Sequence, residues 1–225
     1  SAYSFNQTSG FSIVKYQGNG NTTTKVAHGI GSAPKCIIIK NLDDAGDNWR
    51  VYHVGVGNED GLQLDNQGDK SPGSNQFYDT DPDTVNFTLG DHVAVNNNGE
   101  NYIAYCFANT PGFSKFGKYV GNADANGPFI YLGFKPAWFM MKRIGSGYSW
   151  AMKDNKRSPF NEATTEVYAN SNDADTTGGA IDFLSNGVKI RNSSGTWNHS
   201  GISYAYLAFA EEPLVSSNGV PATAK

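Results

Sequence analysis

Short apolar runs separated by clusters of asparagine, glycine and aspartate extend along the whole chain. No stretch of 11 or more residues has the i, i+3, i+4, i+7 spacing of an amphipathic helix. Glycine and asparagine tolerate the positive φ of tight turns, and aromatic side chains suit a pleated, half-buried surface. The pattern therefore predicts an all-β protein, with strands in the first half at residues 11–17, 35–40, 49–54, 84–89, 92–95 and 102–108.

The second half of the chain repeats this pattern at an offset close to 102 residues. Turn glycines, a strand-opening proline, apolar runs and aromatics recur, whereas none of the four histidines has a histidine at the matching position. The matched pairs include Phe11 with Phe113, Pro34 with Pro136, Trp49 with Trp150, Phe87 with Phe183 and Tyr102 with Tyr204. A tandem duplication of a small domain explains such a pattern.

We therefore expect two tandem, internally duplicated β-sandwich units with a jelly-roll-like arrangement. The first would occupy residues 1–110 and the second 111–212, followed by a polar tail at 213–225. The boundary is expected in the turn residues Asn109-Thr110-Pro111-Gly112. Cys36 and Cys106 stand where the second copy has Trp138 and Ala208, so both are predicted to be buried and unpaired.

One loop of the second copy is the first candidate for a binding site. Asn98-Gly99 predicts a tight hairpin before Tyr102, and matching Phe87 with Phe183 makes the same connection six residues longer in the second copy. We expect the extra residues in the loop that carries Trp197, Asn198 and His199. A tryptophan among amide and hydroxyl groups suits contact with a sugar or a protein neighbour. The alternative is that Trp197 folds back onto its own sheet.

Acidic residues supply a second candidate. Asp79, Asp81 and Asp83, and likewise Asp173 and Asp175, alternate along the chain before a matched strand, and alternating carboxylates can bind Ca²⁺. The competing interpretation is a solvated turn, because the glycine and glutamate of an EF-hand loop do not follow. Separated carboxylates can also hydrolyse sugars, but the two copies share no such pair. We therefore expect a non-enzymatic protein without a cofactor, apart from the calcium alternative.

Charge divides unequally between the copies. Residues 11–108 contain 6 Lys+Arg and 12 Asp+Glu, and residues 113–210 contain 10 and 7. The difference is explained either by drift on solvated faces or by docking of unlike surfaces in an assembly. The basic residues are too few and too scattered for a duplex-DNA surface, so no nucleic-acid partner is expected. No apolar run of 18 residues predicts a membrane span.

Several segments carry a resemblance to a known kind of protein. Residues 28–40, followed by Trp49-Arg50-Val51-Tyr52-His53, resemble a repeat unit of structural proteins from marine tailed bacteriophages. Residues 95–108 are similar to the second half of that unit, and the end of the chain, 208–213 and 223–225, resembles the way such proteins finish. The second copy departs from the pattern at Trp138-Phe139-Met140-Met141.

The resemblance implies a structural protein of the virion. A tail fibre or other appendage that contacts the host surface is the first expectation, and a capsid decoration (cement or head-fibre) protein is the second. A carbohydrate-binding module is the third. The implied partners are other virion proteins, further copies of the chain (a trimer in the case of a fibre) and a host surface glycan.

Overall fold

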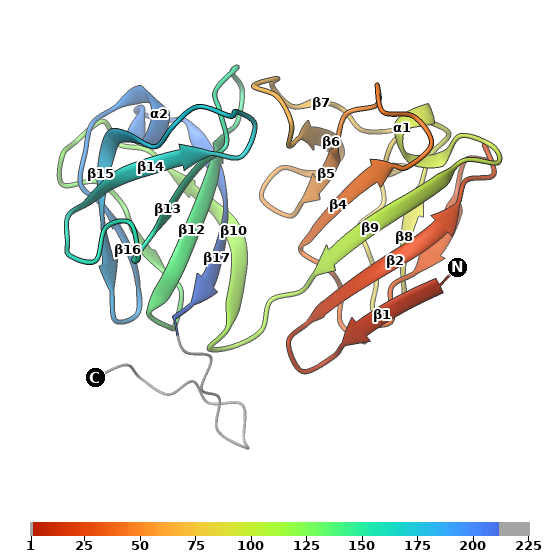
Figure 1. Ribbon diagram of the computed structural model, residues 1–225, viewed down its shortest axis with the longest axis horizontal. Helices are drawn as coiled ribbons and strands as arrows, with labels where there is room; N and C mark the ends of the chain where they lie inside the picture. The colour runs from red at the N-terminus through yellow and green to blue at the C-terminus, as the bar shows by residue number, and fades with distance from the viewer. Residues whose placement is uncertain (1, 212–225) are drawn as a thin grey trace. The chain divides into compact units, whose positions relative to one another are not determined.

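The computed structural model describes residues 2–211 and divides the chain into two compact units, Ser1–Asn109 and Thr110–Lys225 (Figure 1). The division falls at the start of the turn segment 109–112. The predicted tail at 213–225 lies outside the described residues. Both units are all-β, and each contains one helical segment of four residues within the described range.

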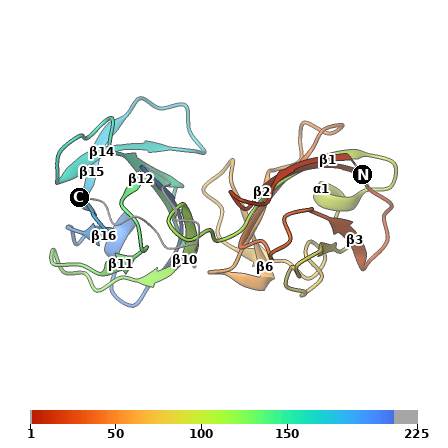
Figure 2. The same ribbon diagram turned by 90° about the horizontal axis from the view of Figure 1, so that it is seen from below.

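The first unit is a seven-stranded sheet facing a two-stranded one. The large sheet has the order β1-β2-β9-β4-β5-β6-β7, and the small sheet pairs β3 with β8. Seen from below, β3 lies across the unit from β1 and β2 (Figure 2). The elements are β1 (Ala2–Asn6), β2 (Phe11–Gln17), β3 (Thr24–Ala27), β4 (Cys36–Asn41), β5 (Arg50–His53), β6 (Gly57–Gln63), β7 (Ser71–Pro72), β8 (Asn86–Leu89), α1 (Val93–Asn96) and β9 (Asn101–Phe107).

The second unit is an eight-stranded antiparallel sheet that curls into a near-barrel. Its order is β10-β17-β12-β13-β14-β15-β16-β11, and the register between β14 and β15 shifts between Ala163 and Thr165. The elements are β10 (Ser114–Val120), β11 (Phe129–Tyr131), β12 (Pro136–Arg143), β13 (Ala151–Asp154), β14 (Ala163–Tyr168), β15 (Thr176–Leu184), β16 (Gly187–Ile190), α2 (Gly195–Asn198) and β17 (Ser203–Ala210).

Alternating burial explains why these segments form strands. In β2 the side chains of Val14 and Tyr16 face the core while Lys15 and Gln17 face solvent. Tyr16 contacts Phe87 of β8 edge-on, with ring centroids 6.2 Å apart, so the two sheets of the first unit meet at this pair. Cys36 and Cys106 are buried and free, as the sequence predicted. Burial raises the pKa of both thiols, so they act as packing groups.

Two expectations about the fold need correction. Residues 92–95 were expected to form a strand, but the chain makes the helical turn α1 there, because Nδ1 of His92 accepts a hydrogen bond from the amide of Ala94 and caps the turn. The jelly-roll order is also not observed in the second unit: the five successive strands from β12 to β16 each pair with the next, which is a meander. Strands β10-β17-β12 and β11-β16 supply the remaining, non-sequential pairs.

Candidate functional site

Trp197 belongs to the core of the second unit. Its side chain is 0% exposed, and its Nε1 donates a hydrogen bond of 2.8 Å to Oε2 of Glu166 on β14. The ring stacks on Phe139, with centroids 6.4 Å apart. The expectation of an exposed contact residue at Trp197 is wrong, and the alternative that it folds back onto its own sheet is correct. The buried carboxylate of Glu166 accepts the hydrogen bond of the indole N–H, so the polar group of the ring has a partner inside the core.

Asn198 is also buried, and it supports the backbone of a loop. Its Nδ2 donates to Oδ1 of Asn122 and to the carbonyls of Asp124 and Asn192, while its Oδ1 accepts from the amide of Asn122. His199, next in sequence, keeps an exposed ring, and its amide donates to Oη of Tyr204. Of the three predicted binding residues, only His199 presents its side chain to solvent.

The first unit builds the same frame without a tryptophan. Nδ2 of Asn96 donates to the carbonyls of Asn21 and Gly90, and its Oδ1 accepts from the amide of Asn19. Tyr16 stacks on Tyr102 at 5.2 Å, and Tyr119 stacks on Tyr204 at 4.8 Å. The hydroxyl of the first tyrosine in each pair donates to a helix carbonyl, that of Val95 or of Trp197.

These contacts show that the loop around Trp197 is not enlarged. α1 ends at Asn96, six residues before Tyr102, and α2 ends at Asn198, six residues before Tyr204. The expected insertion arose from matching Phe87 with Phe183. In the structure Phe87 pairs with Val26 as Val188 pairs with Ile130, so β16 takes the place of β8. The strand β15 then takes the place of β7, because it pairs with β14 as β7 pairs with β6.

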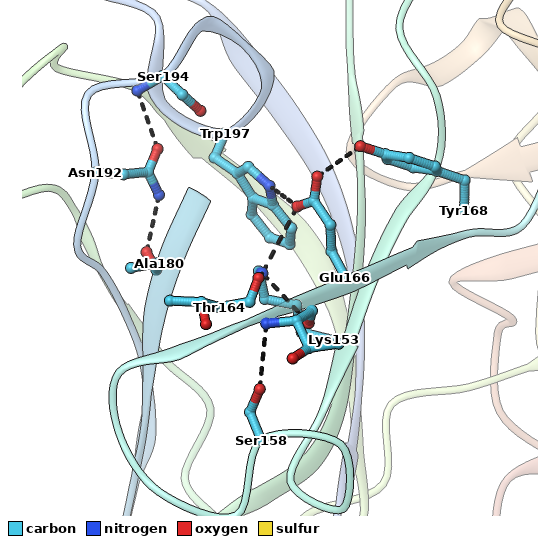
Figure 3. Close-up of polar contacts among 10 residues, drawn as sticks. Lys153, Ser158, Thr164, Glu166, Tyr168, Ala180, Asn192, Ser194 and Trp197 are labelled. Atoms are coloured by element: carbon cyan, nitrogen blue, oxygen red, sulfur yellow. Dashed lines mark hydrogen bonds and ion pairs between the residues drawn. The ribbon is translucent and has the colours of Figure 1, made fainter. Parts of the chain in front are cut away.

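A buried charged cluster surrounds Trp197 (Figure 3). Nζ of Lys153 on β13 lies 3.6 Å from Oε2 of Glu166 and 5.3 Å from the centre of the Trp197 ring. The same amine donates to the carbonyl of Thr164 at 2.8 Å, and the hydroxyl of Tyr168 donates to the other oxygen of Glu166 at 2.5 Å. Each charge therefore has several partners, which a buried ion pair requires.

Burial dominates the electrostatics of this cluster. It lowers the pKa of Lys153 from 10.5 to about 8, against the opposing effect of Glu166. The pKa of Tyr168 rises to about 12, mainly through burial and then through its hydrogen bond to Glu166. Lys153 and Glu166 are almost completely buried, so they form a hydrogen-bonded ion pair within the core that positions Trp197.

A surface hollow lies at the connection between β13 and β14. A hollow of about 460 Å³ is lined by Phe160 together with Lys135, Asn155, Lys156, Ser158, Pro159, Asn161, Phe183 and Glu211. The side chain of Phe160 is 82% exposed. This connection is the longer of two corresponding ones: paired residues Met152 and Val167 are 15 positions apart, whereas Val51 and Leu62 in the first unit are 11 apart.

Hydrogen bonds brace the loop on both sides of Phe160. The amides of Lys156 and Arg157 donate to Oδ1 of Asp154, and Oγ of Ser158 accepts from the amide of Thr165. After the ring, Asn161 exchanges two hydrogen bonds with the backbone of Phe183, at 3.0 and 2.9 Å. Phe160 is thus held in solvent by an ordered loop. Phe160 was not predicted as a binding residue, although the sequence Ser158-Pro159-Phe160-Asn161 predicts a turn and its aromatic residue has no counterpart in the first unit.

Three of the five aspartates predicted to bind calcium accept hydrogen bonds from other groups of the protein. Oδ1 of Asp81 accepts from the hydroxyl of Tyr52, and Oδ1 of Asp83 accepts from the amides of Val85 and Asn86, which lower the pKa of Asp83. Asp173 accepts from the hydroxyl of Ser171. Asp79 and Asp175 are exposed. Across residues 2–211, no three histidine, cysteine or carboxylate side chains gather where they could hold a metal ion.

The fold and these contacts define a two-unit all-β protein with a shared Tyr–Tyr–Asn frame. The chain belongs to the family described as domain of unknown function DUF7483, whose model matches residues 1–213. No curated protein and no solved structure matches the chain. Among the described residues, no helix is long and apolar enough to cross a membrane.

Proposed function

We propose that the chain is a non-enzymatic structural protein of a tailed-phage virion, part of a tail fibre or another appendage, and that its two units descend from one duplicated unit. The single observation that carries the proposal is the frame that the units have in common. In each unit a stacked tyrosine pair, a buried asparagine and a four-residue helical turn lock the last strand to a neighbouring one, β9 to β2 and β17 to β10.

Further matched hydrogen bonds support the duplication. The amide of Gly99 donates to the carbonyl of Gly18, and the amide of Gly201 donates to that of Gly121. The amides of Asn97 and His199 donate to the hydroxyls of Tyr102 and Tyr204, respectively. The bonds between glycines join segments more than 75 residues apart in each unit, and the bonds to the tyrosines close the helical turn. They therefore depend on the tertiary fold of each unit. Every recurring group serves the scaffold, which fits a structural role.

The resemblance of residues 28–40 and 95–108 to repeats of marine phage structural proteins supports the assignment to the virion. In the structure these segments form β4 and β9, which pair at the centre of the first sheet, together with α1. Partners in the assembly would be other virion proteins and further copies of the chain. The acidic first unit and basic second unit provide complementary charges for such contacts.

Immunogold labelling of purified virions, with antibodies raised against the full chain, tests the proposal directly. We expect gold on the tail or its appendages, and sedimentation of the isolated protein should show a closed oligomer, a trimer in the case of a fibre. Gold over the capsid at a copy number matched to capsomers would instead identify a decoration protein. Virions that lack the chain by mass spectrometry would contradict both.

A further inference from the structure

The surface of the second unit presents an aromatic ring where the first unit has none. The β5–β6 turn of the first unit is short and carries no aromatic side chain, whereas the β13–β14 loop carries Phe160. A ring that is 82% exposed loses contact with water only when a ligand covers it. The bracing of the loop by Asp154, Ser158 and Asn161 removes much of the entropy cost of ordering it on binding.

Polar groups that converge beside the ring indicate the chemistry of the ligand. Lys135 and Glu211 form an ion pair of 2.5 Å, and Nδ2 of Asn155 donates to Oε1 of Glu211 at 2.7 Å. Oδ1 of Asn155 is buried and accepts no hydrogen bond from the described residues. The amide of Asn155, the amine of Lys156 and the carboxylate of Glu211 all line the hollow, and together they can donate to and accept from the hydroxyls of a ligand.

The size and the charge of the hollow further restrict the class of ligand that it could bind. Its volume of about 460 Å³ lies in the lower half of the range for small-molecule sites, about 300–1,000 Å³. Charged and amide side chains outnumber apolar ones in the lining, unlike the core of a protein–protein interface, where charged residues are depleted. Lys135 and Lys156 face one carboxylate, that of Glu211, so the lining is net positive.

We propose that the hollow beside Phe160 binds a short saccharide, with the apolar face of a sugar ring packed on Phe160 and its hydroxyls bonded to Asn155, Lys156 and Glu211. The excess of lysine favours a sugar that carries a carboxylate. The proposal deepens the host-surface contact suggested above and rests on it only for the biological source of the sugar.

Saturation-transfer NMR on the full chain tests the proposal, with glucose, galactose, N-acetylglucosamine and glucuronic acid as probes. We expect saturation transfer to at least one sugar, and calorimetric titration should show that glucuronic acid binds more tightly than glucose and loses affinity as salt increases. Phe160→Ala should weaken binding at least about 10-fold, a change of about 1.4 kcal/mol. Phe160→Trp should retain it, because the flat ring remains.

Tyr131→Ala is the matched control, since Tyr131 is a 60% exposed aromatic on β11 of the same unit and lies outside the hollow. Both alanine variants should unfold at the wild-type temperature, and only Phe160→Ala should lose sugar binding. Absence of binding to all four probes, or equal binding by Phe160→Ala and the wild type, overturns the saccharide site. So does loss of self-association, without any sugar effect, in Phe160→Ala. None of these results bears on immunogold labelling, which tests the virion assignment separately.

Discussion

The two units use the same polar frame and fill their cores differently. Where the first unit has Val95 at the third position of its helical turn, the second has Trp197. Where Tyr52 pairs with Ile37 in the first sheet, Lys153 pairs with Phe139 in the second. Gly61, which precedes the paired residue Leu62, corresponds to Glu166, which precedes Val167.

Compensating exchanges keep both cores filled. In the first unit, a Cβ at Gly61 would collide with the side chain of Gln76, which occupies that space. In the second, Glu166 occupies the space itself and lies over the bare backbone of Gly178. Both units have a buried asparagine at the same place, Asn96 and Asn198, because backbone groups without hydrogen-bond partners are costly. The core side chains differ between the units, as long as their total volume and polarity are balanced.

The largest effect on stability is expected from truncating Trp197, the largest core side chain that differs between the two units. Trp197→Ala removes a fully buried indole and leaves Glu166 without its Nε1 donor, so we expect the free energy of unfolding of the second unit to fall by about 3–5 kcal/mol. Val95→Ala, at the matching place, should cost less because fewer atoms are removed. Hydrogen exchange read by mass spectrometry reports the two units separately. A cost below about 1 kcal/mol for Trp197→Ala would show that Trp197 does not fill the core.

The buried asparagines should respond alike in both units. Asn96→Ala and Asn198→Ala each leave buried backbone groups without a hydrogen-bond partner. Each substitution should therefore destabilise its own unit by about 2–3 kcal/mol. Asn98→Ala, at an exposed turn position, is the control and should change stability by less than about 0.5 kcal/mol. The same hydrogen-exchange measurement checks all three. Strongly unequal costs would contradict a shared frame.

The buried pair Lys153–Glu166 should make the stability of the second unit, and not that of the first, depend on pH above neutrality. Unfolded Lys153 keeps its proton to about pH 10.5, whereas the folded pKa is about 8, so the unfolded state binds more protons between these values and stability rises with pH. The gain is at most about 3 kcal/mol. Urea unfolding from pH 7 to 10 should show the rise in the wild type and lose it in Lys153→Met. Parallel curves for the two proteins would exclude this role for Lys153.

The smallest effects are expected at the stacked tyrosines. Tyr16→Phe and Tyr119→Phe each remove one hydroxyl that donates to a helix carbonyl, at 2.7 and 2.8 Å, and leave the ring stack intact. Each substitution should cost about 1 kcal/mol. Chemical unfolding of the two variants should therefore give matching shifts. A loss at one position with none at the other would mean that only one unit depends on this contact.

Much of the strand pattern could be predicted from the sequence. Residues 11–17 form β2 as expected, and the expected strands at 35–40, 49–54, 84–89 and 102–108 overlap β4, β5, β8 and β9. Strands β1, β3, β6 and β7 were not predicted: β3 and β7 are short, β6 is nearly all polar, and every residue of β1 is exposed, so all four depend on pairing with a neighbour. Alternation is a local signal, whereas an edge strand is defined by its partner.

The candidate site was less accessible to sequence reasoning. Trp197 and Phe160 are both aromatics in polar loops, and nothing within either loop distinguishes them. The carboxylate that holds Trp197 inward is 31 positions away, on β14, and the hydrogen bonds that hold the Phe160 loop outward end on Phe183, 22 positions from Asn161.

By itself, the sequence determined that the chain is all-β, where most central strands run and that two cysteines are buried and free. These properties follow from alternation and composition, which act within a few residues. Only the tertiary structure decided that Trp197 points into the core, that Lys153 and Glu166 meet there and that Phe160 faces solvent. The direction of a loop side chain depends on partners brought together by folding, and their distance along the chain hides them from any local pattern.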